Sequence, residues 1–512
     1  MPISRRSFLT RSGLAAAASS LGMPALVRAQ PAQDHRNGQR PRHIIHMVSD
    51  GMSSGTLTCG DYFSQTLRGR GTKWIELYSR PSTQVALMNT RSLNSIVTDS
   101  SAASSTWGSG SRVKNGAVNV LPDGRVLKPL YSLFGQAGWK RGLVTTTEIT
   151  HATPAGFAAN AEERSSADRI ARQYLDRNIE VLMGGGKQFF DPKKRKDKFN
   201  LIEEAEDKGW KVFTKRSDLI GAPNGVKWLG LFADGHLPYT VDQISDVKLT
   251  ASVPTLAEMT KAALANLQQN EHFILQIEGG RVDHGAHSSD VAATLHDQVA
   301  FDEAIETVLQ FREEHPDTLV VITTDHGNSN LGLNGSGADY SGSCQAMEKL
   351  KGTKKSFGGI YDAIKKAGKV YKVSAIFGKG KPEIVEIAPK KLAQVIGDLT
   401  GFKMKDAKAE QFARFLAAKE VPMYDQLNSM SAQLGQLMAN HTGLGWSGAS
   451  HTADYSPLVA VGPGAERFRG FIQNVDVFKH YTELAGIDFR NPSLPLMAES
   501  GPSAMEVEEA YV

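Results

Sequence analysis

Short apolar runs alternate with amphipathic segments along the chain from residue 43 onward. Five runs are typical of strands, at 43–48, 141–145, 273–277, 319–323 and 457–461. Apolar positions recur at three- and four-residue spacing over 167–177, 255–270 and 291–314, which predicts helices. Strands that alternate with helices form mainly parallel sheets. We therefore predict an α/β fold, a three-layer αβα sandwich with a mainly parallel central sheet.

The residues that follow these strands are chemically alike. Asp50 follows the first run, Glu278 follows the third, and Asp325 and His326 follow the fourth. In parallel sheets, ligands bind at the carboxyl ends of the strands. We therefore expect a binding site at that edge of the sheet.

Residues 330–440 differ in amino-acid composition from the rest of the chain. They are rich in Gly and Ser at first, then in Lys over 349–355, and then show helical periodicity over 407–437. A structureless connection of that length inside a domain is uncommon. We therefore predict one catalytic domain over 43–512, with a cap inserted at about 330–440.

The composition is that of a folded protein with one large or two ordinary domains. The chain has 512 residues, 22% of them charged and 40% hydrophobic, which excludes wholesale disorder, collagen and coiled coil. Residues 1–29 contain four Arg and no acid, which accounts for the net charge of +4. The balanced remainder gives no indication of a nucleic-acid-binding face. With Cys59 and Cys344 as the two cysteines, a disulfide-dense scaffold is also excluded.

The N-terminus has the pattern of an export signal. The twin-arginine segment Ser-Arg-Arg-Ser-Phe-Leu at 4–9 precedes a mild apolar run over 13–27 and a cleavage point after Ala29. That run is shorter than the roughly 20 apolar residues of a membrane span, which disfavours the alternative, a retained anchor. We predict a signal peptide at 1–29, a linker at 30–42, and a folded protein exported to the periplasm or secreted.

Several acidic and imidazole side chains are spaced for metal binding. Asp283 and His287 are four residues apart, so on a helical turn both project from one face and can bind one ion. Oxygen and nitrogen ligands without thiolates favour zinc where His contributes, and magnesium where only Asp, Glu and Thr do. The candidate ligands, enough for more than one ion, are Asp50, Glu278, Asp283, His287, Asp325, His326 and His451.

A candidate nucleophile lies in the small-residue segment 97–104. Ser100 follows Asp99 and could begin a helix, where backbone N–H groups face a developing negative charge. On its own, the segment is more typical of an ordinary helix cap. The metal-binding residues favour a nucleophile instead, because a hydroxyl attacks well only when a base or cation stabilises its alkoxide.

Taken in order, these motifs resemble those of the alkaline phosphatase family. The segments that carry the resemblance are Asp50-Gly51, Thr98-Asp99-Ser100, His151-Ala152-Thr153-Pro154-Ala155, Glu278 with Asp283 and His287, Asp325-His326-Gly327 and His451-Thr452. The resemblance implies hydrolysis of phosphate monoesters to an alcohol and inorganic phosphate through a phosphoserine on Ser100. It also implies a homodimer.

The resemblance assigns roles to individual residues. It implies two zinc ions, one held by Asp283, His287 and His451 and the other by Asp325, His326 and Asp50. It implies a magnesium ion held by Asp50, Thr153 and Glu278. Arg164 falls at the position of the family's phosphate-binding arginine, and His151 and His284 are implied to bind phosphate as well.

Some features leave alternatives open. His151 and His284 stand where some bacterial members have Asp and Lys, so the third ion is less certain than the two zincs. Cys59 and Cys344 do not reproduce the cysteine pairs of the best-known bacterial members, and we expect no disulfide. A sulfatase, a phosphodiesterase, or an exported protein that merely binds phosphate or metal are the alternatives. The chain lacks the Cys-x-Pro-x-Arg segment of a sulfatase.

Overall fold

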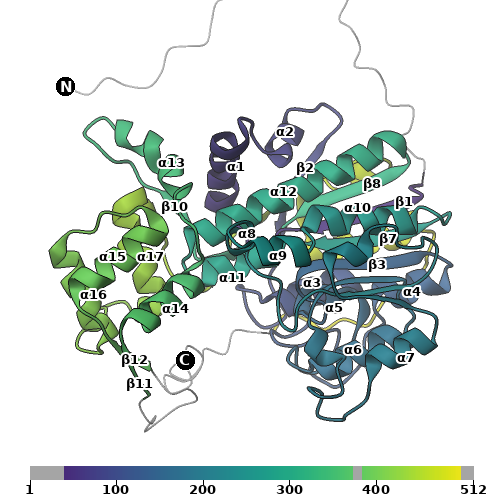
Figure 1. Ribbon diagram of the computed structural model, residues 1–512. Coiled ribbons are helices and arrows are strands. Elements are labelled where there is room, and N and C mark those ends of the chain that lie inside the picture. Colours follow the sequence, from purple (N-terminus) through teal and green to yellow (C-terminus); the bar gives the residue numbers. More distant parts are fainter. Residues whose placement is uncertain (1–39, 373–382, 498–512) are drawn as a thin grey trace, which may run out of the picture. The chain divides into compact units, whose positions relative to one another are not determined.

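The computed structural model describes residues 40–372 and 383–497 (Figure 1). The predicted signal peptide, 1–29, and most of the predicted linker lie outside the described residues. What is described lies within one compact unit. No helix in those two ranges is long and apolar enough to cross a membrane.

A ten-stranded sheet forms the centre of the fold (Figure 1). Among the described residues, β15 is the one strand of this sheet that runs antiparallel to its neighbours, β8 and β2. The mainly parallel sheet is thus confirmed. In spatial order, the strands are β16 (Gly470–Gln473), β2 (Gln84–Asn89), β15 (Ser456–Val461), β8 (Thr318–Thr323), β1 (His43–Val48), β7 (Phe273–Glu278), β3 (Lys140–Glu148), β4 (Val181–Gly185), β6 (Trp228–Leu231) and β5 (Lys211–Phe213).

The five predicted strands correspond to the centre of this sheet. They are β1, β3, β7, β8 and β15, and every residue of β1, β7 and β8 is buried. Continuous apolar runs of this kind are typical of strands covered on both faces. At one edge, β2 alternates buried with exposed positions and β16 has one buried residue, Ile472; neither strand is among the five predicted.

Two hydrophobic clusters cover the two faces of the sheet. Alternate residues of β1 belong to different clusters, Ile44 and Val48 to one and Ile45 and Met47 to the other. Since successive side chains of a strand point to opposite faces, the sheet is the middle layer of three. The predicted αβα sandwich is confirmed.

Helices form the outer layers (Figure 1). Those that pack on the face of Ile44 are α3 (Ser100–Ser109), α4 (Leu130–Gln136), α5 (Ala152–Ala158), α6 (Ala167–Asp176), α7 (Leu201–Asp207) and α18 (Asn474–Leu484). Those that pack on the face of Ile45 are α2 (Lys73–Tyr78), α10 (Leu256–Leu267), α11 (Arg281–His287) and α12 (Val291–Glu314). The helices α1 (Ser54–Arg68), α8 (Thr240–Ile244) and α9 (Val247–Ser252) complete the surroundings of α12.

The region of the predicted cap, 330–440, is connected to the αβα layers through two short strands that pair with each other. Here β10 (Gly332–Leu333) pairs with β13 (Leu444–Gly445). The chain between them has a hydrophobic cluster of its own, which includes Ile360, Leu392 and Phe412. Its elements are α13 (Ala346–Leu350), α14 (Phe357–Ala367), β11 (Lys369–Lys372), β12 (Glu383–Glu386), α15 (Pro389–Thr400), α16 (Asp406–Leu416) and α17 (Met430–Thr442).

Two carboxylates attach this region to the αβα layers. The N–H of Phe357, at the start of α14, donates to Asp290 Oδ2, and the N–H of Ser356 donates to Asp242 Oδ1 at 3.0 Å. Asp290 also caps α12 through the N–H of Ala293. One buried carboxylate therefore joins the start of α14 to the start of α12.

Candidate active site

Three neighbouring central strands bring carboxylates to one edge of the sheet. Asp50 follows β1, Glu278 ends β7, and Asp325 follows β8. The N–H of Gly51 donates to Asp325 Oδ1 at 3.0 Å, which joins two of these loops. Gly51 has φ +67°, and a Cβ there would lie 2.3 Å from Asp283 Oδ1. The close approach of Asp283 therefore requires glycine at this position.

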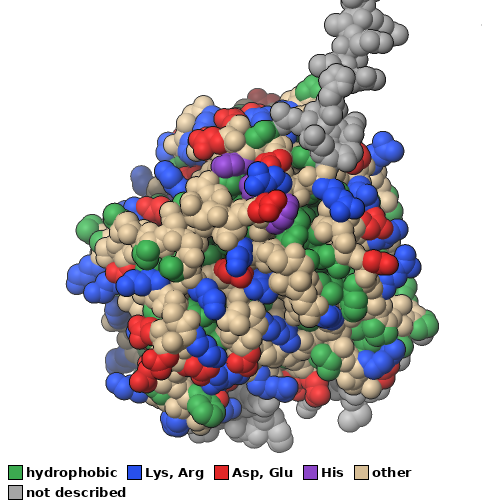
Figure 2. Space-filling model, turned by 90° about the vertical axis from the view of Figure 1, so that its right-hand side faces the viewer, with side chains coloured by type: hydrophobic (Ala, Val, Ile, Leu, Met, Phe, Trp, Pro, Cys, Tyr) green, Lys and Arg blue, Asp and Glu red, His purple; other side chains and the backbone are tan. Residues whose placement is uncertain are grey.

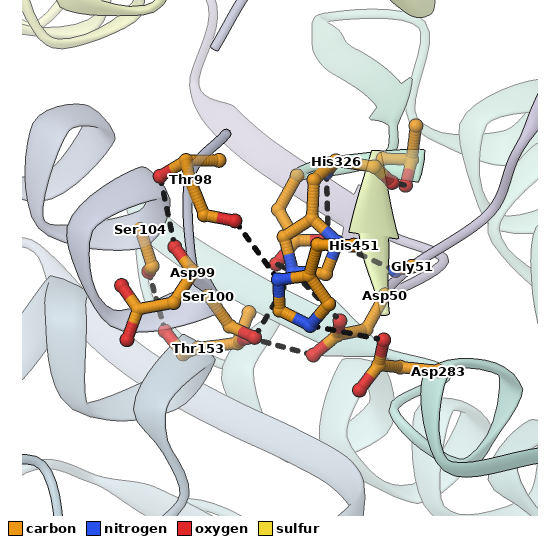
Figure 3. Close-up of polar contacts among 12 residues, drawn as sticks. Asp50, Gly51, Thr98, Asp99, Ser100, Ser104, Thr153, Asp283, His326 and His451 are labelled. Atoms are coloured by element: carbon orange, nitrogen blue, oxygen red, sulfur yellow. Dashed lines mark hydrogen bonds and ion pairs between the residues drawn. The ribbon is translucent and has the colours of Figure 1, made fainter. Parts of the chain in front are cut away.

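Ser100 is the first residue of α3 and faces the predicted metal ligands (Figure 3). Asp99 caps the helix by accepting a hydrogen bond from the N–H of Ala102 at 2.9 Å. The hydroxyl of Ser101 donates to Asp99 at 2.6 Å, whereas Ser100 Oγ lies 3.2 Å from His326 Nε2. Of the two adjacent serines, Ser100 is therefore the one available for chemistry at the site.

Asp283, His287 and His451 converge as the spacing predicts. Asp283 and His287 share one face of α11, and His451 arrives on β14 (His451–Thr452), which pairs with β9 (Gly327–Asn328). Nε2 of His287 lies 3.4 Å from Asp283 Oδ2, and Nε2 of His451 lies 3.6 Å from Asp283 Oδ1. His326 also comes within ligand distance of Asp283 and His451.

The hydrogen bonds of three imidazoles define which nitrogen carries the proton. In His287, His451 and His326, Nδ1 lies against a backbone carbonyl. These acceptors are, in the same order, Ala449 O at 2.8 Å, Thr98 O at 2.8 Å and Gly327 O at 3.2 Å. A carbonyl oxygen only accepts, so these contacts assign a proton to each Nδ1, and in the neutral ring each Nε2 then presents a lone pair to the site. This is the arrangement of metal-binding histidines.

Asp50, Asp325 and His326 form a second cluster. Their ligand atoms lie within 4.8 Å of one another, and all three side chains are fully buried. Asp50 Oδ1 and Asp325 Oδ2 have no hydrogen-bond partner among the described residues. Burial raises the pKa of Asp325 to about 8, and burial together with the charge of Asp325 raises the pKa of Asp50 well above its ordinary value. A divalent cation would compensate these carboxylates, so the residues fit a metal ion.

The third cluster comprises Asp50, His151 and Glu278. Thr153 Oγ1 donates to Asp50 Oδ2 at 3.2 Å, which places it beside this cluster as predicted. One oxygen of Glu278 accepts from Thr145, while its Oε1 has no hydrogen-bond partner among the described residues and lies 3.9 Å from His151 Nδ1. The structure thus adds an imidazole nitrogen to the predicted oxygen ligands of the third site.

Arg164 enters the site from the loop that follows α5. One Nη1–H donates to Asp99 Oδ2 at 3.1 Å, and Nη2 lies 3.2 Å from His151 Nε2. The guanidinium is thereby held near Ser100, with 30% of the side chain exposed. A planar guanidinium with part of its donors exposed is suited to bind two oxygens of a phosphate.

His284 lies in a group of aromatic rings beside the third cluster. Its ring centroid is 5.4 Å from that of His151 and 4.5 Å from that of His236. Arg281 Nη1 donates to His284 Nδ1 at 2.6 Å, and the Arg281 guanidinium stacks on Tyr239 at 3.7 Å. The structure brings together every predicted site residue.

His236, Arg281 and Tyr239 were missed by sequence reasoning. His236 accepts a hydrogen bond from the N–H of Glu148 at 3.0 Å, and burial lowers its pKa to about 3. It lies five residues after the end of β6, so the signal that identified Asp50, a polar residue just after a strand, applies to it as well. The four-residue length of β6 hid that signal.

The fold and the site together define a class. An αβα sandwich with buried carboxylates and imidazoles around one serine has the features of a metal-dependent hydrolase. Residues 41–487 match the family model described as alkaline phosphatase. The chain belongs to the alkaline phosphatase family, it is a phosphate monoester hydrolase, and the family binds divalent metal ions.

Similar proteins and solved structures support this family assignment. The chain is 29% identical to alkaline phosphatase 4 of Bacillus subtilis, over 93% of this chain and 94% of the relative. It is 30% identical to alkaline phosphatase 3 of the same organism, over 90% and 93%. Among solved structures, that of Thermus thermophilus alkaline phosphatase superposes with a TM-score of 0.80 at 32% identity, covering 93% of this chain and 98% of the other.

Proposed function

We propose that Ser100 is the nucleophile of a two-step phosphate monoester hydrolysis carried out at the three clusters. The observation that carries this proposal is the place of its hydroxyl. Ser100 Oγ lies at the N-terminus of α3, 3.2 Å from His326 Nε2. The ring of His326 belongs both to the cluster with Asp283 and His451 and to the cluster with Asp50 and Asp325. The alternative hydroxyl, that of Ser101, is held by Asp99.

The donor sets fit the ions that the family implies. Donor sets that include imidazole suit zinc, and a set of carboxylate and hydroxyl oxygens suits magnesium. When bound, the ions stabilise negative charge on the attacking and leaving oxygens. We assign one zinc to Asp283, His287 and His451, a second zinc to Asp50, Asp325 and His326, and magnesium to Asp50, Thr153 and Glu278.

The residues of the chain perform two displacements at phosphorus. In the first, Ser100 gives up its hydroxyl proton to solvent, Oγ bonds to phosphorus as the ester P–O bond breaks, and the departing oxygen takes a proton from solvent to give the alcohol. In the second, water attacks phosphorus and gives up a proton to solvent, the bond to Ser100 Oγ breaks, Oγ regains a proton from solvent, and inorganic phosphate leaves. The free N–H groups of the first turn of α3 face the charge that develops in both steps.

Arg164 positions the phosphate in this scheme. Asp99 anchors one arm of the guanidinium and His151 contacts the other, with 30% of the side chain exposed. His151 and His284 would lie along the same phosphate, as the resemblance implies. When the guanidinium fork holds two unesterified oxygens, a monoester still has a third such oxygen and a second negative charge, whereas a diester has neither, which favours monoesters at a site with several cations.

The paired substitutions Ser100→Ala and Ser101→Ala test the proposal. We expect Ser100→Ala to lower turnover of p-nitrophenyl phosphate by at least about 10³-fold, with metal content by mass spectrometry unchanged. Ser101→Ala, which removes the neighbouring hydroxyl, should retain most of the activity. Unchanged turnover in Ser100→Ala would remove this serine from the mechanism.

We also propose the export, domain organisation and assembly implied by the sequence. Residues 1–29 would direct a folded protein through the twin-arginine route to the periplasm or the medium, and 43–512 would form one catalytic domain with a cap at about 330–440. The protein would assemble as a homodimer. Replacement of Arg5 and Arg6 by Lys should leave phosphatase activity in the cytoplasmic fraction, and light scattering of the purified protein would give its oligomeric state.

A further inference from the structure

The cap, residues 330–440, has more basic than acidic side chains. It contains 17 Lys and Arg against 10 Asp and Glu, whereas the other residues contain 41 against 44. Figure 2, which views the side where α10 and β1 lie in Figure 1, shows acidic and basic side chains interspersed. An excess of positive charge in one folded region indicates an anionic partner for that region.

A cavity in the cap concentrates part of this charge. Its volume is about 480 Å³, which falls in the usual range of small-molecule sites. It lies where α13, the turn after α15, α16 and the end of α17 meet. The lining residues that carry charge or a ring are Lys349, Phe402, Lys403, Lys405, Lys408 and His441, and no acidic residue lines the cavity.

The four lysines are available to a ligand. None of them forms an ion pair with a carboxylate in the described ranges, and only Lys408 has a side-chain partner there, the amide of Gln411. Other cap lysines do pair, such as Lys351 with Glu348 at 3.2 Å and Lys365 with Asp362 at 3.2 Å. What distinguishes the four lysines is that they line one cavity without an acidic residue among them.

An aromatic pair forms a rigid wall of the cavity. The rings of Phe402 and His441 stack with centroids 5.0 Å apart and an interplanar angle of 29°. Phe402 is 8% exposed and belongs to the hydrophobic cluster of the cap. Burial and the nearby charge of Lys349 lower the pKa of His441, which keeps the ring neutral at pH 7. The wall is thus a fixed support and the lysines supply the charge.

We propose that this cavity binds a small anion that carries several phosphate groups, at a site separate from the catalytic one. Four ammonium groups around a space of this volume match several negative charges in one molecule better than a single orthophosphate. None of the lining residues belongs to the three metal-binding clusters. The site therefore does not depend on the proposed catalytic roles.

Titration of the full-length protein with inorganic triphosphate tests this proposal. The protein carries Ser100→Ala so that the probe is not consumed, and excess magnesium keeps the probe from removing bound ions. We expect one equivalent of triphosphate to bind outside the catalytic site, with an affinity that falls as salt is added. The double substitution Lys403→Glu/Lys405→Glu should weaken that binding by about tenfold or more, because two ammonium groups of the site become carboxylates.

The matched control is Lys390→Glu/Lys391→Glu, the same charge change on exposed residues of α15 outside the cavity. It should shift the dissociation constant by less than about twofold, because the added charges lie in solvent where salt screens them. With Ser100 intact, both double variants should hydrolyse p-nitrophenyl phosphate like the parent, which separates this site from the catalytic one. Equal weakening in both double variants, or no triphosphate binding beyond the catalytic site, would overturn the proposal.

Discussion

The Nε2 atoms of His287 and His451 face each other at a distance of 2.9 Å. Nδ1 of each ring faces a backbone carbonyl, so in the neutral form of both rings neither Nε2 carries a proton to donate to the other. Two lone pairs at that distance repel unless a cation lies between them. This geometry, with Asp283 alongside, is the strongest indication in the structure that the site is built around a metal ion.

Removal of metal should therefore affect both activity and stability. After dialysis against a chelator we expect p-nitrophenyl phosphate turnover to disappear and the thermal midpoint to fall, because an ion that binds only the folded state stabilises it. Zinc and magnesium added back should restore both. Full activity in protein shown to be metal-free would contradict the mechanism.

Asp283 should be needed for metal binding more than for folding. Its carboxylate lies between His287 and His451, so Asp283→Ala should lose bound zinc together with activity. Glu271→Ala, at a side chain 78% exposed, is a suitable control and should retain both. Metal content by mass spectrometry and turnover on the same samples give the answer. Loss of activity with full zinc content would assign Asp283 a different role.

Arg164 should act through the geometry of its guanidinium. Arg164→Ala removes charge-assisted hydrogen bonds worth about 1.5–3 kcal/mol, so kcat/KM should fall by roughly 10- to 100-fold. Arg164→Lys retains the charge but not the planar fork, and we expect it to recover only part of the loss. Competitive inhibition by inorganic phosphate measures the same contact without turnover. If the Lys variant matched the parent in both measurements, charge alone would suffice.

Asp297 should make stability depend on pH below neutrality. The carboxyl is buried and accepts hydrogen bonds from the N–H and hydroxyl of Thr240. Burial raises its pKa to about 7 from the ordinary 3.8. Between these two pKa values the folded state binds more protons than the unfolded state. The contribution of Asp297 to the free energy of unfolding therefore falls as the pH rises from about 4 to 7. Above about pH 7 this contribution no longer changes.

Asp297→Asn removes this titration, and Thr240 can reorient its hydroxyl to accept from the amide. Relative to the parent, the variant should therefore gain about 2 kcal/mol in the free energy of unfolding between pH 5 and pH 8. Urea unfolding of both proteins at the two pH values measures this difference in the free energy of unfolding. Effects of bound metal that are common to both proteins cancel in the difference. A difference that did not change with pH would show that Asp297 is ionised in the folded protein.

The central strands and the residues that follow them could be predicted because burial leaves a clear pattern. Asp50 and Asp325 each follow an uninterrupted apolar run, and the ends of parallel strands meet in space. The direction of β15 could not be predicted, since hydrophobicity carries no information about strand polarity. Its reversal is what brings the residues before it, including His451, to the edge of the site.

The rest of the site depends on contacts between distant segments. His236 follows a strand of only four residues, and its neighbours His151 and His284 come from elsewhere in the chain. The pair of His151 with Arg164 joins a helix cap to a loop, which no spacing along the sequence encodes. The family resemblance identified His151, His284 and Arg164 but not His236, and the contacts among all four required the structure.

The insertion between β10 and β13 imposes an order on maturation. His326 precedes the inserted residues and His451 follows them, 125 positions later in the chain. During synthesis, Asp50, Asp283 and His326 all leave the ribosome well before His451 does. His451 thus becomes available only after the whole segment between β10 and β13 has been synthesised, so its contacts with Asp283 and His326 cannot form earlier.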